Sequence, residues 1–281
     1  MPNIAIVTDS TAYLPPEQIE TYGITVVPLS VVFEESAFEE EIEMSTADFY
    51  EKMKKADEHP TTSQPSPGKF LATYERLAEN HDAIISIHLS SGISGTYQTA
   101  LAVAEDIHGA EVYCFDSEIS CMVQGFYVLE AARLAMEEAT VDDILDRLEE
   151  MKKTVRAYFM VENLNHLHRG GRLSGAQAMV GSLLQIKPVL HFENKLIVPF
   201  EKVRTEKKAV NRILELFHED AGSGEAVKAT VIHANRPEKA DKLRSALIEK
   251  YPHAEVDVSY FGPVIGTHLG ERSLGLGWYK P

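Results

Sequence analysis

The stretch AIISIHLSSGISGTYQ, residues 83–98, decides the fold of this chain. Residues 83–89 are mostly apolar and have the length of a buried strand. Residues 90–95 are mostly polar and contain two glycines, and a helical pattern follows from Thr96 to about Ile107. A strand, a loop and a helix in this order form one unit of a parallel sheet that is covered by helices.

The same unit occurs on both sides of this stretch. Further strands are expected at 4–7, 25–33 and 112–115, and helices at 16–22 and 125–139. Polar residues follow the first and the last of these strands and separate each of them from a helix. We therefore expect the first half of the chain to be an α/β domain with a parallel sheet.

The second half has a different pattern, which begins after a helix over 141–154. Strands are expected at 158–161, 189–203 with a hairpin turn at Glu193-Asn194, 229–233 and 255–261, and helices at 206–219 and 238–250. This order predicts an α+β domain with a mostly antiparallel sheet. A chain of 281 residues is long enough for two domains, and we expect them at 1–154 and 155–281.

The composition is that of a globular protein and restricts its partners. Hydrophobic residues make up 44% and charged residues 25% of the chain, and the net charge of −16 repels the phosphates of a nucleic acid. The most apolar stretch, 24–33, is much shorter than the ~18 residues of a membrane span. Because the first residues also lack the pattern of a leader peptide, we expect a cytoplasmic protein.

Neither the cysteines nor the paired histidines predict a metal site or a disulfide. Cys114 and Cys121 have no second pair of ligands nearby and are expected to be reduced thiols. His166 and His168 would share one face of a strand without a third ligand at a suitable spacing, so we expect surface or structural roles for them.

Five glutamates crowd residues 34–41. Like charges are not buried together without partners, and this stretch offers no cation. We therefore expect residues 34–35 and 39–41 to form a solvated connection without a chemical role.

Three segments place Ser and Thr residues shortly before a helix. They are Asp9-Ser10-Thr11, Thr61-Thr62-Ser63 ahead of Ser66-Pro67, and Ser90 through Thr96. Loops at the carboxyl ends of parallel strands gather where ligands bind, and a helix N-terminus attracts an anion. Gly92 and Gly95 would let the third backbone approach a ligand closely. The alternative is that these hydroxyls only cap their own helices.

The loops do not have the pattern of a nucleotide site, since the lysine of a P-loop and the spaced glycines of a dinucleotide fold are missing. A serine hydrolase is the alternative enzyme. Ser94 lies between a strand and a helix like a nucleophile elbow, although Thr96 stands where that motif has its second glycine. Its triad would combine Ser94 and His268 with either Asp9 or Asp116.

Four other residues could contact an anion. Arg169 and Arg172 flank two glycines, Arg204 lies in a second basic segment, and such arginines either bind an anion in bidentate fashion or lie exposed at a turn. His268 lies in a glycine-flanked segment that could bring its imidazole to a ligand, with a structural role as the alternative.

Six motifs along the whole chain resemble those of the DegV family. They are DSTAYLP (9–15), TSQPSP (62–67), SSGISGTYQ (90–98), RGGRLS (169–174), LQIKP (184–188) and IGTHLG (265–270). Local differences, Tyr13 where an acidic residue is frequent and Glu271-Arg272 after the last motif, affect none of the site residues.

This resemblance implies a carrier and not an enzyme: a two-domain protein that binds one long-chain fatty acid between its domains without a cofactor. The implied carboxylate contacts are Thr62, Ser94, His268 and the backbone amide of Gly95. Members of the family act as the lipid-presenting subunit of a bacterial fatty acid kinase system. In that system a separate ATP-dependent kinase phosphorylates the bound acid, and the acyl-phosphate feeds phospholipid synthesis.

The same resemblance implies that Arg169, Arg172 and Arg204 face the kinase or the acyl-phosphate, and that any membrane contact is transient. Hydroxyls, helix amides and a histidine suit a carboxylate. At ~0.8 kcal/mol per buried methylene, a tail of about 14 methylenes gains roughly 11 kcal/mol over water but almost nothing over a bilayer. The tunnel must therefore be dry and continuous. Its lining residues are not predicted, because they look like core residues in a sequence.

Overall fold

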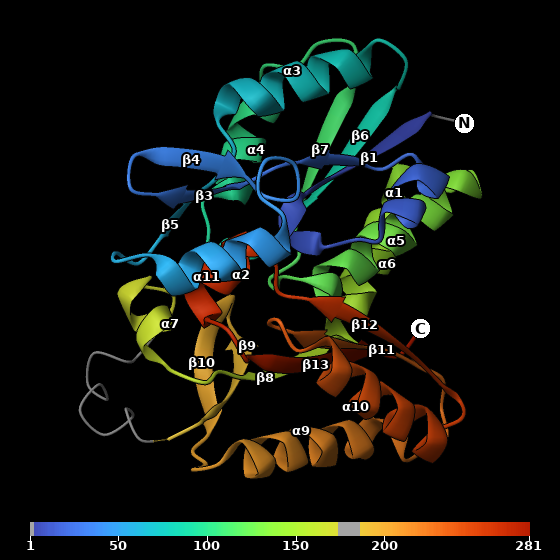
Figure 1. Cartoon of the computed structure of the whole chain (residues 1–281). Coiled ribbons are helices and arrows are strands. Elements are labelled where there is room, and N and C mark those ends of the chain that lie inside the picture. Colours follow the sequence, from blue (N-terminus) through green and yellow to red (C-terminus); the bar gives the residue numbers. More distant parts are fainter. Residues whose placement is uncertain (1–2, 174–185) are drawn as a thin grey trace.

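The computed structural model describes residues 3–173 and 186–281, and it contains one large sheet from each half of the chain and a small third sheet from the first half (Figure 1). The first sheet has four parallel strands in the order β2-β1-β6-β7. Their bounds are Thr25–Val27 (β2), Ile4–Asp9 (β1), Ala83–His88 (β6) and Glu111–Asp116 (β7). The parallel sheet predicted for the first half is therefore confirmed.

The second sheet has six strands in the order β10-β9-β8-β13-β11-β12. Their bounds are Leu196–Glu201 (β10), Val189–Glu193 (β9), Arg156–Met160 (β8), Leu274–Tyr279 (β13), Val227–His233 (β11) and Ala254–Tyr260 (β12). The pair β11 and β12 is parallel and the other pairs are antiparallel, which confirms the mostly antiparallel sheet. The central strand β13 was not predicted, since its alternation of glycine with large residues is not typical of a strand.

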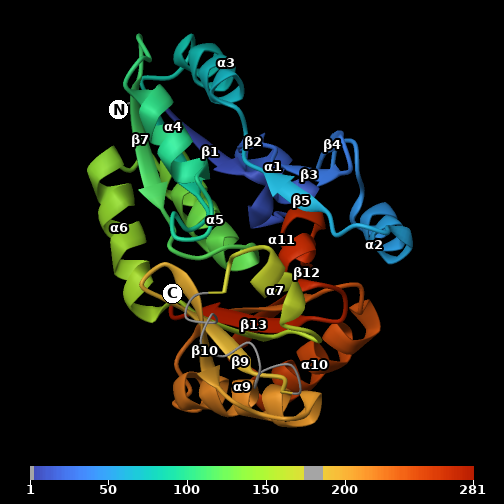
Figure 2. The same ribbon diagram turned by 90° about the vertical axis from the view of Figure 1, so that its left-hand side faces the viewer.

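Helices separate and cover the two sheets. On the parallel sheet, α3 and α4 lie on one face and α5 on the other, with α1 and α6 packed against α5, while α9 and α10 cover the outer face of the second sheet (Figures 1 and 2). Their bounds are Pro67–Ala78 (α3), Thr96–Ala104 (α4), Met122–Met136 (α5), Pro16–Tyr22 (α1), Val141–Thr154 (α6), Glu206–Ala221 (α9) and Pro237–Lys250 (α10). The largest cluster of buried side chains lies between the two sheets and takes residues from both halves. We propose that one domain ends with α6 at residue 154 and that the next begins at 155.

Two short helices of the second half lie near the boundary between the halves. Figure 2 shows α11 (Pro263–Leu269) between strands β3 (Ser30–Phe33) and β5 (Thr61–Ser63) above and the six-stranded sheet below, with α7 (Asn165–Arg169) beside it. His166 and His168 lie on α7, so the strand predicted for them is wrong. No helix among the described residues is long and apolar enough to cross a bilayer.

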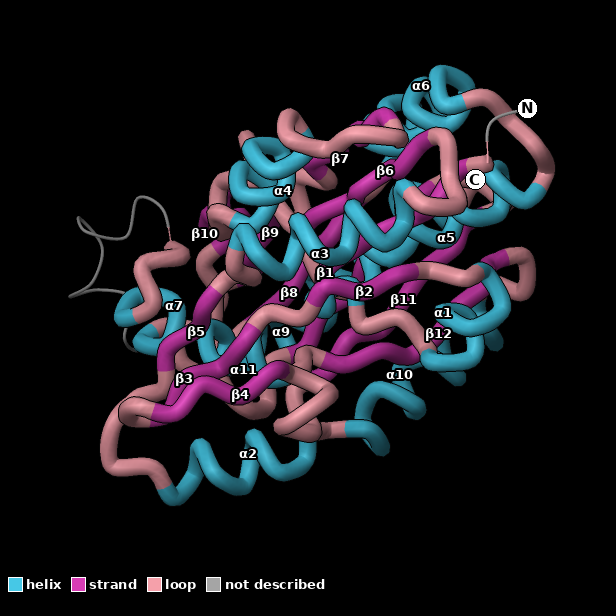
Figure 3. Tube along the Cα trace, turned by 90° about the horizontal axis from the view of Figure 1, so that it is seen from above, coloured by secondary structure: helices cyan, strands magenta, loops and turns pink. Residues whose placement is uncertain are grey.

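A small antiparallel sheet, β4-β3-β5, lies beside the parallel one, with α2 (Thr46–Lys55) on its outer side (Figure 3). Its strands are Ser36–Glu39 (β4), Ser30–Phe33 (β3) and Thr61–Ser63 (β5). The single strand predicted at 25–33 is divided at Pro28, which has no N–H for a ladder. Thr61–Ser63 is a strand and not a loop that follows a parallel strand, which corrects the prediction for the second hydroxyl segment.

The acidic stretch also differs from its prediction. Residues 36–39 form β4, and the side chain of Glu40 is only 1% exposed. Partners that are distant in sequence hydrogen-bond its carboxyl, so the expected solvated connection is wrong at this residue.

Candidate functional site

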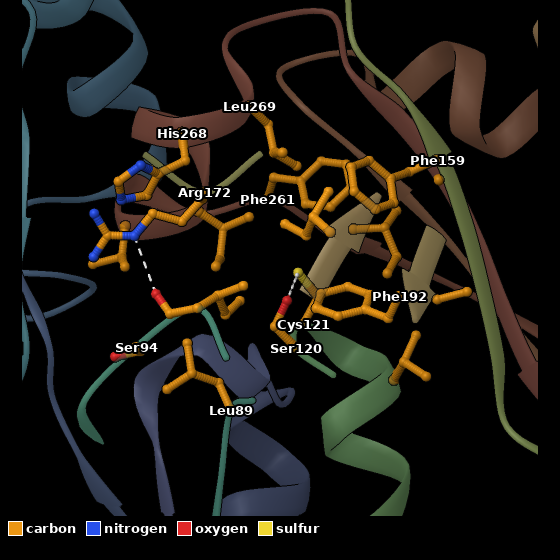
Figure 4. A pocket seen from close by; sticks show the side chains of 18 of the residues that line it. Leu89, Ser94, Ser120, Cys121, Phe159, Arg172, Phe192, Phe261, His268 and Leu269 are labelled. Carbon is orange, nitrogen blue, oxygen red and sulfur yellow. Dashed lines mark hydrogen bonds between the residues drawn. The ribbon is translucent and has the colours of Figure 1, made fainter. Parts of the chain in front are cut away.

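A cavity of about 290 Å³ lies between the two halves of the molecule and is lined by residues of both (Figure 4). This volume is near the lower end of the range for small-molecule sites, about 300–1,000 Å³. Figure 4 shows His268, Arg172 and Ser94 at one side of the cavity and Phe159, Phe192 and Phe261 at the other. The cavity therefore has a polar end and an apolar body.

The apolar body is formed by aromatic and aliphatic side chains and by two glycines of β13. The aliphatic lining consists of Leu29, Leu89, Ile93, Val123, Ala157, Ile197, Ile232, Val264, Ile265 and Leu269. Alternate residues of a strand point to opposite faces, and Trp278 of β13 packs in the core beneath α9 and α10. Gly275 and Gly277 lie on the other face, and a Cβ at Gly277 would overlap with Val123. The absence of side chains at these glycines lets Val123 and Phe261 pack closely against β13 in the wall of the cavity.

The polar end gathers side chains from four elements. Thr62 comes from β5, Ser94 from the turn before α4, His268 from α11 and Arg172 from the segment after α7. Together with Gly95, these residues include all four carboxylate contacts that the sequence suggested. They are far apart along the chain, and the fold brings them to one cavity.

Ser94 and Gly95 form the N-terminus of α4. Gly95 is the N-cap residue, and the Ser94 hydroxyl accepts a hydrogen bond from Thr96 N at 3.3 Å. The hydrogen bonds between described residues include none from the N–H of Gly95. A Cβ at Gly95 would overlap with Gln64, whose amide donates to Thr99 Oγ1 at 2.5 Å. A side chain at position 95 would therefore displace the Gln64 amide from this place.

The His268 imidazole is buried and neutral. Its Nε2 lies 2.9 Å from Thr62 Oγ1, and its Nδ1 has no hydrogen-bond partner among the described residues. The Nδ1 edge packs against Gly170 so closely that a Cβ there would overlap with it. Burial, followed by the nearby Arg172 charge, lowers the pKa of His268 to about 3. A proton on Nε2, donated to Thr62, leaves the Thr62 hydroxyl free to donate to a ligand.

Arg172 supplies a positive charge at the same end. Its Nε donates to Ile93 O at 3.1 Å, and a terminal nitrogen donates to Gly170 O at 2.6 Å, so the guanidinium is held in place. Burial lowers the pKa of Arg172, but a guanidinium stays charged in a protein. Arg169 and Arg204 are exposed and do not line the cavity, so Arg172 is the one of the three arginines that lies at its polar end.

The first hydroxyl segment lies away from this cavity. Asp9 Oδ2 lies 3.0 Å from His88 Nδ1, and the Thr11 hydroxyl donates to Asp9 Oδ1. Although burial alone would raise it, the hydrogen bond and charge of His88 hold the pKa of Asp9 below its usual value. These polar groups satisfy one another in the core, and the segment does not line the cavity.

The hydrolase triad is not assembled. The Ser94 hydroxyl lies 2.9 Å from Thr96 Oγ1, and His268 pairs with Thr62. Asp9 is held by His88, and Asp116 Oδ2 accepts from Lys195 Nζ at 2.9 Å. The geometry gives no support to a serine nucleophile. Among the described residues, no three metal-ligating side chains are grouped so that they could hold a metal ion.

The sequence missed a strained residue in the lining. Cys121, which precedes α5, has a φ of 63° and a ψ of −161°, a combination that is almost restricted to glycine. The thiol is buried, and burial raises its pKa to about 12. Nothing in the local sequence indicates this backbone geometry. Two motif segments cannot be placed in full, because residues 174–185 lie outside the described part of the chain.

The comparisons with known proteins agree with this architecture. The family described as "Uncharacterised protein, DegV family" matches residues 3–281. "Protein DegV" of Bacillus subtilis (strain 168) is 59% identical over 277 residues, which are 98% of this chain and 99% of that protein. A crystal structure described as DegV, a fatty acid binding protein from Bacillus subtilis, is 58% identical, covers 100% of both chains and has a TM-score of 0.96.

A more distant solved structure shares the same architecture. It is described as showing fatty acid binding of a DegV family protein from Thermus thermophilus, and it is 32% identical to this chain. The match covers 99% of this chain and 100% of that chain, with a TM-score of 0.92.

Proposed function

This chain belongs to the DegV family, and on that premise we propose that it is a carrier that binds one long-chain fatty acid in the cavity between its two halves. The observation that carries the proposal is the division of this cavity into a polar end and an apolar body. A fatty acid has the same division. The solved relatives from Bacillus subtilis and Thermus thermophilus, described as fatty acid binding, support the choice of ligand.

In this proposal, the carboxylate accepts hydrogen bonds from the hydroxyls of Thr62 and Ser94 and from the N–H of Gly95. His268 holds Thr62 through Nε2, at the 2.9 Å separation described above. The partial positive charge at the N-terminus of α4 and the guanidinium of Arg172 compensate the negative charge of the head group. Such compensation is required, because an unpaired carboxylate loses its hydration on burial.

We also propose that the carrier presents this carboxylate to a separate ATP-dependent fatty acid kinase in the cytoplasm, with transient membrane contact when lipid is exchanged. Arg172 then lies beside the group that becomes an acyl-phosphate. Arg169 and Arg204, which are exposed, are proposed to contact the kinase. The kinase supplies the phosphoryl transfer, and the carrier supplies a fixed position for its substrate.

Lipid extraction tests the binding proposal directly. The purified protein is denatured, extracted and analysed by mass spectrometry, and a delipidated sample is titrated with oleate and palmitate. We expect one acyl chain per protein and saturable uptake. A sample without an acyl chain that also takes up neither fatty acid would refute the carrier.

A coupled assay tests the presentation proposal. With a fatty acid kinase and ATP, Arg204→Ala is expected to retain bound lipid but to give slower acyl-phosphate formation. Arg76→Ala, which removes an exposed arginine of α3, is the matched control. Loss of lipid from Arg204→Ala, or equal rates for both variants, would contradict the assignment.

A further inference from the structure

Glu40 is a buried carboxyl that the proposed fatty-acid site does not use. It follows β4 and is 1% exposed. Its Oε1 lies 2.5 Å from Ser10 Oγ, and its Oε2 accepts a hydrogen bond from Tyr13 OH at 3.0 Å. Both partners belong to the turn after β1, so the carboxyl joins two segments of the first half.

The same carboxyl also holds the beginning of α11 in the second half. Val264 N donates to Glu40 Oε2 at 2.9 Å, and Ile265 N donates to Tyr13 OH at 3.2 Å. The N-cap residue of α11 is Gly262, which has no side chain to cap the helix, and Pro263 has no N–H. Glu40 and Tyr13 therefore satisfy the two free amides of the first helical turn from more than 200 residues away.

This helix carries one side of the head-group site. Val264, Ile265, His268 and Leu269 all line the cavity, and all seven residues of α11 are buried. A helix rises 1.5 Å per residue, so His268 lies only about one turn from the anchored amides. A shift of the first turn would consequently move the imidazole relative to Thr62.

We propose that Glu40, assisted by Tyr13, is a positioning residue for the carboxylate site. It anchors the first turn of α11 and thereby sets the contact between His268 and Thr62. This inference rests on the proposed function only for its consequence for lipid binding. The anchor itself can be tested in lipid-free protein.

The protonation of Glu40 determines which variant is conservative. The titratable groups that face it are Tyr13 in the turn after β1, Glu41 next to it, Tyr260 of β12 and Cys121 before α5, and none of them is a cation. Burial raises the pKa of Glu40 to about 8, so the acid is neutral at pH 7. Glutamine has the same shape and can accept from Val264 while its NH₂ donates to Ser10.

Four variants test the anchor. Glu40→Ala removes the acceptor of Val264, Tyr13→Phe removes the acceptor of Ile265, and Glu40→Gln retains one acceptor. Glu35→Gln changes an exposed glutamate of the same acidic stretch and serves as the control. Three quantities are measured at pH 7: the amide exchange rates of Val264 and Ile265, the ¹⁵N resonances of His268, and the dissociation constant for oleate.

We expect Glu40→Ala to exchange Val264 about tenfold faster and to bind oleate about tenfold more weakly, with a shifted His268 signal. Glu40→Gln and Glu35→Gln are expected to resemble the wild type. In Tyr13→Phe the exchange of Ile265 should increase while Val264 stays protected, and this variant decides the question if Glu40→Ala does not fold.

Wild-type exchange rates at both amides, in folded Glu40→Ala or in Tyr13→Phe, would overturn the anchor. Faster exchange with an unchanged His268 signal would overturn the positioning role. If the wild type itself binds no fatty acid, the proposed function fails, whereas exchange and the His268 resonances still decide the inference.

Discussion

At the scale of single residues, the proposed head-group site depends on neutral hydrogen-bond donors and one fixed cation. We predict that Thr62→Val and Ser94→Ala each weaken oleate binding by about 5- to 150-fold, equivalent to about 1–3 kcal/mol for a lost bond to a charged group. Isothermal titration of delipidated protein measures the effect. Ser66→Ala is the control, because its hydroxyl caps α3 outside the cavity. It should lower stability and leave affinity unchanged.

The buried imidazole predicts a dependence of stability on pH. The pKa of His268 is about 3 in the folded protein and about 6.5 when unfolded, so the unfolded chain binds more protons between these values. Stability is therefore lost as the pH falls below 6.5, by up to ~1.4 kcal/mol per pH unit from this group. His268→Gln should lack this component when urea unfolding is compared at pH 7 and pH 5. An equal loss in both proteins would contradict a neutral His268.

Single residues also show why part of the site could be predicted. Thr62, Ser94, Gly95 and His268 stand in motifs that resemble a known family, so their positions were expected before the geometry was known. The burial of Glu40 could not be predicted. Its partners come from the turn after β1 and from α11, and local sequence does not show which segments will meet.

At the scale of elements, the glycines of β13 determine how much space a tail has. A Cβ at Gly275 would lie 3.2 Å from Phe159 Cβ and 3.3 Å from Phe261 Cζ, which is tight but allows small shifts. We predict that Gly275→Ala narrows the cavity and weakens palmitate binding about tenfold more than laurate binding. Competition titrations with both fatty acids measure the ratio, and an unchanged ratio would exclude Gly275 from the wall of the tail site.

A glycine elsewhere provides the comparison for this substitution. Gly68 lies in α3, where an added Cβ would have only an ordinary contact with Ser66 Oγ at 3.9 Å. Gly68→Ala should raise the free energy of unfolding by about 0.5–1 kcal/mol, because alanine favours the helix. Its preference between palmitate and laurate should remain that of the wild type.

The anchor of α11 predicts a pH dependence of the opposite sign. The pKa of Glu40 is about 8 in the folded protein and near 4.5 when unfolded, so its contribution to stability is present at low pH and is lost as the pH rises towards 8. Glu40→Gln remains neutral. Relative to this variant, the wild type should lose up to ~1.4 kcal/mol per pH unit between about pH 5 and pH 8. If the free energy of unfolding, measured in urea, depends on pH equally in both proteins, Glu40 is ionised throughout this pH range.

Helices and strands with a regular pattern could be predicted, and those with a glycine-rich or short sequence could not. The helix at 141–154 matches α6, while the helix expected at 125–139 is α5, which begins three residues earlier at Met122. The sequence does not predict β13, because two of its six residues are glycines, which line the cavity and are not typical of a strand. The sequence predicts a loop in place of β5, because three hydroxyl residues have no apolar face of their own.

At the scale of the whole molecule, a bound fatty acid should stabilise the fold, since its tail would fill space between the two halves. For a ligand at 100 times its dissociation constant, the expected gain is about 2.7 kcal/mol. Thermal unfolding of delipidated protein with and without oleate measures it. Methyl oleate has the same tail without the carboxylate and should stabilise much less. Equal shifts of the unfolding temperature by oleate and methyl oleate would mean that the polar end contributes nothing to the binding energy.

The two large sheets were predictable from the sequence, whereas the small sheet β4-β3-β5 and the cavity were not. The change from alternating strand and helix units to a meandering pattern after α6 is visible in the sequence. The cavity depends on which apolar side chains of each half are left without a packing partner. That selection appears only when both halves are assembled.

The thiol of Cys121 offers a chemical probe of how often the cavity between the two halves opens. It lines the cavity and is 4% exposed, so we expect an alkylating reagent to reach it only when the cavity opens to solvent. In a Cys114→Ser background Cys121 is the single cysteine, and the rate at which it is labelled reports the frequency of these openings. A bound fatty acid should slow the labelling of Cys121, so the labelling rate with and without lipid would report how long the fatty acid is retained.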